Sequence, residues 1–310
     1  MSNLLLVAQQ VFILFALMGV GAGLRRTRLV DEKGIDGIVN LLILVVTPCL
    51  IVDCFQRPFE PSMLASLGEA FLVAVAGHVA AILLVGRVVR HRDENVRRPL
   101  MLAAVFSNAG FMGIPLEQAI LGEAGVFFGV VYVVVFNLFM WSWGLRLMDG
   151  GAGPVNRWKM VVNPGTVGIA LGLPLFLLSV KLPAVLSVPV HHLSNLNTPL
   201  AMIVIGYSLA GAKLGKVLRL SAAHVAVAFR LVAYPLVVLA ALYPFRAGLD
   251  RRMALAVVIA ASAPVAAMVS MFAVKFGRDV DASVAVVCGS TLLSIVTMPL
   301  VIALAMSVLQ

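Results

Sequence analysis

Long apolar runs, separated by short polar or glycine- and proline-rich segments, repeat along the whole of this 310-residue chain. A helix needs about 20 mostly apolar residues to cross the hydrocarbon core of a bilayer. Runs of about this length predict ten membrane-spanning helices, numbered here as spans 1 to 10: Leu4–Leu24, Gly34–Phe55, Leu67–Val89, Pro99–Leu121, Ala124–Leu147, Pro164–Val180, His192–Ala212, Ala222–Pro244, Met253–Phe276 and Ala282–Val308.

The composition excludes a soluble globular protein. Hydrophobic residues make up 62% of the chain, charged residues only 12%, and the mean hydropathy is +1.06. Soluble domains carry about twice that share of charge, because most of their exterior faces water. The fold class expected is therefore an all-α membrane protein. Span 1 is expected to be a retained helix and not a cleaved signal peptide, because its arginines follow the apolar run.

The charges predict an orientation. Most of the 23 Lys and Arg residues lie in the segments after spans 1, 3, 5, 7 and 9, although the formal net charge of +9 alone would also fit a nucleic-acid-binding protein. Basic residues near span ends stay on the cytoplasmic side, so both termini are expected on the periplasmic or extracellular side. This placement favours contact with the lipid bilayer and no nucleic-acid partner.

The two halves of the chain resemble each other weakly. Thr47-Pro48 in span 2 corresponds to Thr198-Pro199 in span 7, and other pairs follow at a similar offset. Five spans per half place the second half in the opposite orientation, which is the inverted repeat common among transporters. The expected organisation is a first five-helix repeat over residues 1–147, a cytoplasmic linker over 148–163, and an inverted repeat over 164–310.

Spans 4 and 9 are expected to break in mid-membrane. Span 4 reads Ser107-Asn-Ala-Gly-Phe-Met-Gly-Ile-Pro115, and span 9 reads Ser262-Ala-Pro264 at the corresponding depth. Proline removes a backbone donor and clashes with the preceding turn, so backbone groups are freed inside the membrane. Two half-helices that begin near the midplane offer N–H donors and partial positive charge to a carboxylate. A simple proline kink is the alternative for each helix.

These residues resemble the auxin efflux carrier family, whose plant branch is the PIN-formed auxin exporters and which is similar to the bile-acid/sodium symporter superfamily. The resemblance is carried by Asn108 to Leu116, by Asn163-Pro164, by Arg230 with Pro235, and by Ala263-Pro264 followed by Phe272-Ala-Val-Lys275. It implies ten helices in two inverted sets of five, in which spans 4 and 9 cross as broken pairs. It further implies a usually dimeric scaffold of spans 1, 2, 6 and 7, against which spans 3–5 and 8–10 move as an elevator that carries an organic anion. A bacterial-type member would lie in the inner (plasma) membrane.

The resemblance implies roles for three residues: Asn108 would hydrogen-bond a substrate carboxylate, and Pro115 and Pro264 would form the crossing. The remaining candidates for substrate binding lie near the breaks or at matched depths in other spans, and they are Gly110, Gly113, Ser262, Asn137, Ser294 and Thr47. Hydrogen bonds between helices are the alternative role for Asn137 and Ser294. No metal site is expected, since the three cysteines lie in apolar runs without metal-ligand spacing.

Three ionisable residues inside spans are candidates for ion coupling or support of the site. Plant members carry an acid and a lysine in span 3, whereas this chain has Ala74 and His78 at the aligned positions. His78 is a candidate for proton coupling, and a histidine that is hydrogen-bonded within the helix bundle is the alternative. Arg230 is expected either in a structural ion pair or in anion attraction. Glu117, just past Pro115, is expected either to couple an ion or to line the outer end of the cavity.

The function predicted is secondary active transport of a small organic anion, with H⁺ or Na⁺ as coupling ion and no other cofactor. The chain lacks a Walker-type GxxxxGK[ST] sequence, so a gradient is expected to drive it. The alternative is a sodium- or proton-coupled carrier or cation exchanger of similar architecture. An intramembrane hydrolase is disfavoured because no second deep acid pairs with Asp53 and no serine–histidine pair is evident in mid-span, so no enzyme is expected. The partners expected are the anion, the bilayer and a second copy of the chain.

Overall fold

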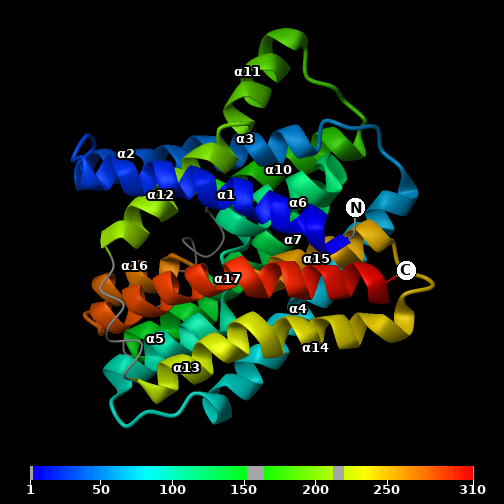
Figure 1. Ribbon diagram of the computed structural model, residues 1–310. Helices are drawn as coiled ribbons and strands as arrows, with labels where there is room; N and C mark the ends of the chain where they lie inside the picture. Colours follow the sequence, from blue (N-terminus) through cyan, green and yellow to red (C-terminus); the bar gives the residue numbers. More distant parts are fainter. Residues whose placement is uncertain (1–2, 152–163, 212–219, 310) are drawn as a thin grey trace.

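The computed structural model describes residues 3–151, 164–211 and 220–309, so most of the predicted linker over 148–163, and Asn163 with it, lies outside the described residues. These residues form helices that run mostly side by side (Figure 1). In chain order they are α1 (Asn3–Arg26), α2 (Glu32–Leu41), η1 (Leu42–Val46), α3 (Thr47–Cys54), α4 (Pro61–Val88), α5 (Glu94–Val105), η2 (Ala109–Gly113), α6 (Ile114–Leu121), α7 (Glu123–Phe139), η3 (Met140–Gly144), α8 (Leu145–Asp149), α10 (Pro164–Leu177), α11 (Ala184–Ser194), α12 (Asn197–Gly211), α13 (Ser221–Ala228), η5 (Phe229–Ala233), α14 (Tyr234–Leu242), η6 (Tyr243–Phe245), α15 (Arg251–Ser262), α16 (Met268–Lys275) and α17 (Val280–Val308).

Five helical segments within the described residues are long and apolar enough to cross a membrane. They are Glu32–Cys54, Pro61–Val88, Glu123–Asp149, Ser221–Phe245 and Val280–Val308. Large apolar side chains such as Leu72, Leu83 and Val296 remain exposed on them, which suits a surface in contact with lipid. The other predicted spans fall on α1 and on shorter or interrupted helices, so ten crossings remain a prediction.

Prolines explain the change of winding at three of the π-helical turns. The π-helical turns η1, η2 and η5 each pass directly into an α-helix with a proline in its first two residues: Pro48, Pro115 and Pro235. Proline cannot donate a hydrogen bond, and its ring clashes with the carbonyl group four residues earlier. A locally widened turn accommodates that ring without ending the helix.

The start of predicted span 7 differs from the prediction. The span was expected to begin at His192, but α12 begins at Asn197, and His192 lies in the last turn of the separate helix α11. Helix α11 projects from the rest of the bundle (Figure 1). The polar pair His191-His192 marks the end of α11 because basic side chains are favourable near the negative end of a helix dipole.

Two apolar cores hold the bundle together. The larger core joins α4, α5 and α7 with α13, α14 and α15, and it extends to α3 and α10. The smaller core, called here the interface core, contains residues of α1, η1 and α12 on one side and of η2, α6, α15 and α17 on the other. Helices α1 and α12 approach so closely that a Cβ at Gly206 would overlap the carbonyl group of Met18.

Both chain ends lie at the same end of the bundle (Figure 1). The turn between α1 and α2, which carries Arg25, Arg26 and Arg28, lies at the opposite end. This arrangement agrees in geometry with the predicted placement of the termini away from the basic segments. The side of the membrane on which each end lies stays a prediction.

Candidate functional site

The helix of predicted span 4 is interrupted between Val105 and Ala109. Helix α5 ends at Val105, and Phe106 follows in an extended conformation. Asn108 is neither helical nor extended, with φ −78° and ψ 51°, and η2 begins at the next residue. The π turn then passes into α6 near Pro115, as the ring of that proline requires.

The helix of predicted span 9 is interrupted after Ser262. Ala263 is extended, with φ −61° and ψ 148°, because the ring of Pro264 disfavours helical geometry in the residue before it. Helix α16 begins at Met268. Both interrupted helices therefore expose backbone polar groups within the protein interior, and those groups need partners.

The two interrupted segments provide partners for each other. The backbone N–H of Asn108 donates to the carbonyl oxygen of Pro264 at 2.6 Å, and the N–H of Ala266 donates to that of Phe106 at 3.0 Å. Ser107 and Val265 face each other in antiparallel pairing between these bonds. The N–H of Val265 donates to the Ser290 hydroxyl at 3.0 Å. We call residues 106–108 and 263–266 the junction.

Arg230 joins the two helix ends that precede the junction. Its Nη1 donates to the carbonyl oxygen of Val105 at 2.7 Å, and its Nη2 donates to that of Ala261. A cation at the negative end of a helix is stabilising, and the planar guanidinium serves both helices at once. Arg230 is fully buried, and none of the salt bridges between described residues includes it. The sequence analysis offered an ion pair as one role for Arg230. The structure instead shows its guanidinium bonded to two backbone carbonyl groups.

Polar side chains surround the junction. Asn108 is 7% exposed, and its amide makes no hydrogen bond with another described residue. The Ser107 hydroxyl is buried without a partner among the described residues. The Ser262 hydroxyl donates to the carbonyl oxygen of Ile259 at 2.8 Å. Of these side chains, Asn108 presents the hydrogen-bond donors that a carboxylate needs.

The glycines between Asn108 and Pro115 have different surroundings. A Cβ at Gly110 would meet no atom within 4 Å, whereas a Cβ at Gly113 would lie 3.4 Å from the Cα of Ala260. The missing side chain at Gly113 therefore allows η2 to pack closely against α15. Gly110 leaves open space beside the junction.

Three predicted binding residues bond to their own helices. Asn137 Nδ2 donates to the carbonyl oxygen of Val133, the Ser294 hydroxyl donates to that of Thr291, and the Thr47 hydroxyl donates to that of Leu42. Such bonds satisfy a hydroxyl or amide without any ligand. Whether these residues also contact a substrate stays a prediction.

His78 and Arg230 are linked through two tyrosines that the sequence analysis did not single out. His78 Nδ1 bonds the carbonyl oxygen of Ala74 at 2.8 Å, and its ring centroid lies 5.1 Å from that of Tyr132. The Tyr132 and Tyr234 hydroxyls are 3.3 Å apart, and the Arg230 guanidinium lies over the Tyr234 ring at 4.2 Å. The sequence offers one signal for this contact. Arg230 and Tyr234 are four residues apart in one helical segment, a spacing that brings a cation and an aromatic ring to the same face.

Glu117 is fully buried on α6, one turn after Gly113. Neither carboxylate oxygen has a hydrogen-bond partner among the described residues. A Cβ at Gly129 of α7 would overlap this carboxylate, so a side chain there would force the Glu117 carboxyl group to move.

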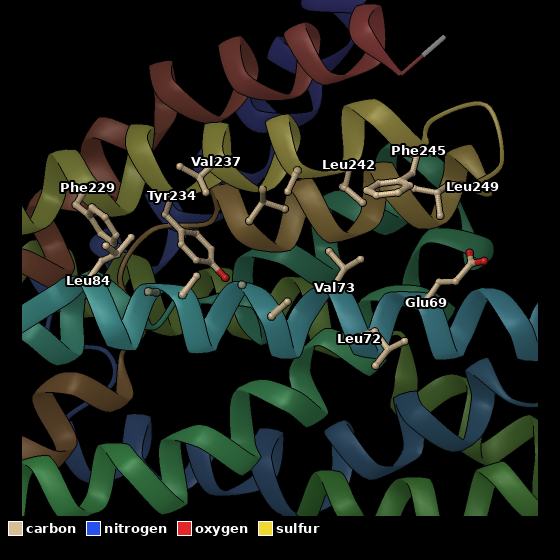
Figure 2. Close-up of a pocket in the computed structure, with 16 residues that line it drawn as sticks. Glu69, Leu72, Val73, Leu84, Phe229, Tyr234, Val237, Leu242, Phe245 and Leu249 are labelled. Carbon is tan, nitrogen blue, oxygen red and sulfur yellow. The ribbon is translucent and has the colours of Figure 1, made fainter.

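A cavity of about 590 Å³ lies between α4 and the η5–α14 segment (Figure 2). Its lining is almost entirely apolar, with Glu69 near one end and Leu84 near the other. None of the predicted site residues lines this cavity. Such a lining suits hydrocarbon better than a carboxylate, so the polar junction, and not this cavity, is the candidate site.

A smaller cavity of about 110 Å³ is polar. Asp53, His191 and Asn195 line one part of it, and Gln118 and Glu123 line another. His191 Nδ1 lies 3.0 Å from a carboxylate oxygen of Asp53. This cavity lies between α3 and α11 on one side and α6 and α7 on the other.

Comparison with known proteins gives two matches. A family described as "Membrane transport protein" matches residues 6–157 and again residues 152–302. The chain is also 27% identical, over 304 residues, to a protein of Methanothermobacter thermautotrophicus named "Uncharacterized transporter". That alignment covers 94% of this chain and 96% of the archaeal protein. The resemblance drawn from the sequence motifs is confirmed by the family match.

Proposed function

This chain belongs to the membrane transport protein family, and from that membership we propose that it is a secondary active transporter of a small organic anion. The substrate class is a mono- or dicarboxylate that binds at the junction. We also propose that the chain crosses a bacterial inner membrane ten times, in two inverted sets of five helices. Both termini would then lie outside.

The observation that carries the proposal is the junction itself. Two half-helices, η2–α6 and α16, begin there, and helix N-termini present N–H groups and partial positive charge. The Asn108 amide adds side-chain donors at the same place. Arg230 is occupied by the carbonyl groups at the opposite helix ends, so its charge acts on an anion only at a distance. A carboxylate is the ligand that these donors suit.

The interface core supports movement of one part of the protein past another. It lies between α1, η1 and α12, which would form the scaffold with α3 and α10, and the helices of the junction. Apolar contacts are not directional, so one face can slide over another without breaking a fixed hydrogen-bond pattern. We propose that the junction moves across the membrane as an elevator against this scaffold. The homodimer implied by the family resemblance stays a prediction.

A cation-coupled carrier or exchanger is the second candidate. Such a protein would place paired acids beside the broken helices, as ligands or proton carriers. On the described part of the two interrupted helices, Glu117 is a buried acid without a second acid bonded to it. This arrangement favours anion transport. A cation would then serve only as the coupling ion.

Uptake by proteoliposomes tests the proposal. Radiolabelled malate, malonate and indole-3-acetate would be supplied under imposed proton or sodium gradients, and protein-free liposomes would serve as the control. Saturable uptake of at least one acid is expected. Absence of uptake of all three acids by folded protein, under every gradient, would contradict anion transport of this class and favour cation exchange.

A further inference from the structure

Glu117 occupies a position that the transport proposal leaves unexplained. Its side chain is fully buried, and neither oxygen has a hydrogen-bond partner among the described residues. Gly113, one turn earlier, lies close to it, because a Cβ there would be 3.8 Å from Glu117 Oε1 and 3.4 Å from Ala260. The carboxyl group therefore lies among η2, α7 and α15, beside the two interrupted helices.

No cation neutralises this carboxyl group within the described residues. Helices α1, α7, α12 and α15 pack against α6 or its preceding π turn, and their titratable or basic side chains are Arg25, Arg26, Glu123, Tyr132, Tyr207, Arg251 and Arg252. None of them bonds either oxygen of Glu117.

A charged carboxylate is too costly in these surroundings. An ion without a partner, removed from water, loses hydration free energy that nothing here replaces. A buried acid meets this cost by holding a proton, since the neutral form loses far less on leaving water.

We propose that Glu117 is the proton-binding site of this transporter, and that one proton moves with each carboxylate. The proposal rests on the proposed function and names its coupling ion. Gly129 closes one side of the carboxyl group, and no cluster of three or more His, Cys, Asp or Glu side chains occurs among the described residues, so a proton is favoured over a sodium ion. The proton binds the carboxylate from water on one side of the membrane and leaves to water on the other.

The coupling follows from the location of the group. Glu117 lies on the same broken helix as Asn108, so a proton and an anion bound to these residues would cross together. Without the proton, the loaded carrier would hold two negative charges on one broken helix, the anion and the carboxylate, and the closed arrangement would be unstable; the empty carrier holds only the carboxylate when it returns. The loaded carrier therefore closes readily only when Glu117 is protonated.

Transport by Glu117→Gln tests the proposal, because glutamine has the shape of the protonated acid and carries no exchangeable charge. The matched control is Glu69→Gln, which changes a half-buried glutamate on α4 beside the apolar cavity. Malate, malonate and indole-3-acetate serve as probes, with the membrane potential clamped to zero. An imposed gradient of one pH unit should give about tenfold accumulation in the wild type, for one proton per anion.

Glu117→Gln is expected to lose this accumulation and to keep substrate exchange at equal pH on both sides, while Glu69→Gln behaves as the wild type. Unchanged accumulation in Glu117→Gln, or accumulation driven by sodium at constant pH, would overturn the proposal. Infrared spectroscopy supplies a readout without transport: the C=O band of a protonated carboxylic acid should disappear in Glu117→Gln. If no probe is transported, the function proposal fails, whereas retention of that band in the variant would refute the proton site.

Discussion

The backbone N–H of Asn108 donates to the carbonyl oxygen of Pro264 at 2.6 Å, and so joins two helices that are far apart in the sequence. Each residue belongs to an interruption that would be unstable alone, because it frees backbone groups in an apolar interior. Paired, the interruptions hold the Asn108 side chain beside the beginnings of two half-helices. The hydrogen bond thus connects the stability of the fold to the placement of the candidate site.

Asn108→Ala is expected to abolish or strongly weaken carboxylate uptake while the protein still folds. The substitution removes side-chain donors but keeps the backbone N–H that bonds Pro264. Hydrogen bonds to a charged group contribute about 1.5–3 kcal/mol, so substrate affinity should fall by about tenfold to a hundredfold. Proteoliposome uptake against substrate concentration measures this change. Asn40→Ala, at an exposed position of α2, is the control, and unchanged uptake in folded Asn108→Ala would rule out the assigned role.

Arg230→Met is expected to lower stability substantially. It leaves the carbonyl groups of Val105 and Ala261 without their guanidinium donor. Each buried unsatisfied group costs about 1–3 kcal/mol, so the unfolding free energy should fall by about 2–6 kcal/mol. Arg230→Lys should recover part of the loss, because an ammonium group can bond one of the two carbonyls.

Thermal unfolding of the detergent-purified protein measures both Arg230 variants. Arg246→Met removes an exposed arginine and should change the melting temperature little. Equal melting temperatures for Arg230→Met and Arg246→Met would show that the two helix ends do not depend on the guanidinium.

Gly206→Ala is expected to disrupt the packing of α1 against α12. The added Cβ would overlap the Met18 carbonyl group, and backbone cannot rotate away as a side chain can. Overpacking of this kind costs about 1–3 kcal/mol or more. Gly19→Ala is the matched control on α1, because a Cβ there meets nothing within 4 Å. The melting temperature should fall for the first variant only, and an equal response of the two would contradict the close contact.

Glu94 predicts a small pH dependence of stability. Hydrogen bonds from Arg97 and Arg98 lower the pKa of this carboxyl group below its ordinary value of 4.5, and it lies before the apolar part of predicted span 4. A lowered pKa in the folded state means that the ion pairs stabilise the protein above pH 4.5 and lose that effect as the pH falls through the lower pKa. Both pairs are partly exposed, so the effect should be small and weaker in high salt.

The measurement is the difference in melting temperature between wild type and Glu94→Gln across pH. A small loss of stability in the variant is expected at neutral pH, and it should disappear at a pH below the lowered pKa. A difference that persists in strong acid would have to come from a source other than these ion pairs.

The sequence predicted both interruptions, but the cause of only one of them is local. Pro264 restricts Ala263, the residue before it, and so breaks the helix after Ser262, whereas Pro115 accounts for the π turn before α6 and not for the break at residues 106–108. The hydropathy pattern does not predict α11, because the apolar stretch between Val180 and His192 is too short for a membrane span. Apolar length alone does not separate a short projecting helix from the start of a span.

The sequence by itself determined that this is an integral membrane protein of helices, since hydropathy is a property of each segment and requires no knowledge of its neighbours. Only the tertiary structure decided that Asn108 bonds Pro264, that Arg230 joins two helix ends, and that Glu117 lies against Gly129. These contacts join residues from different helices. Their partners are set by how helices pack in space, and a local pattern of apolar and polar residues does not specify that packing.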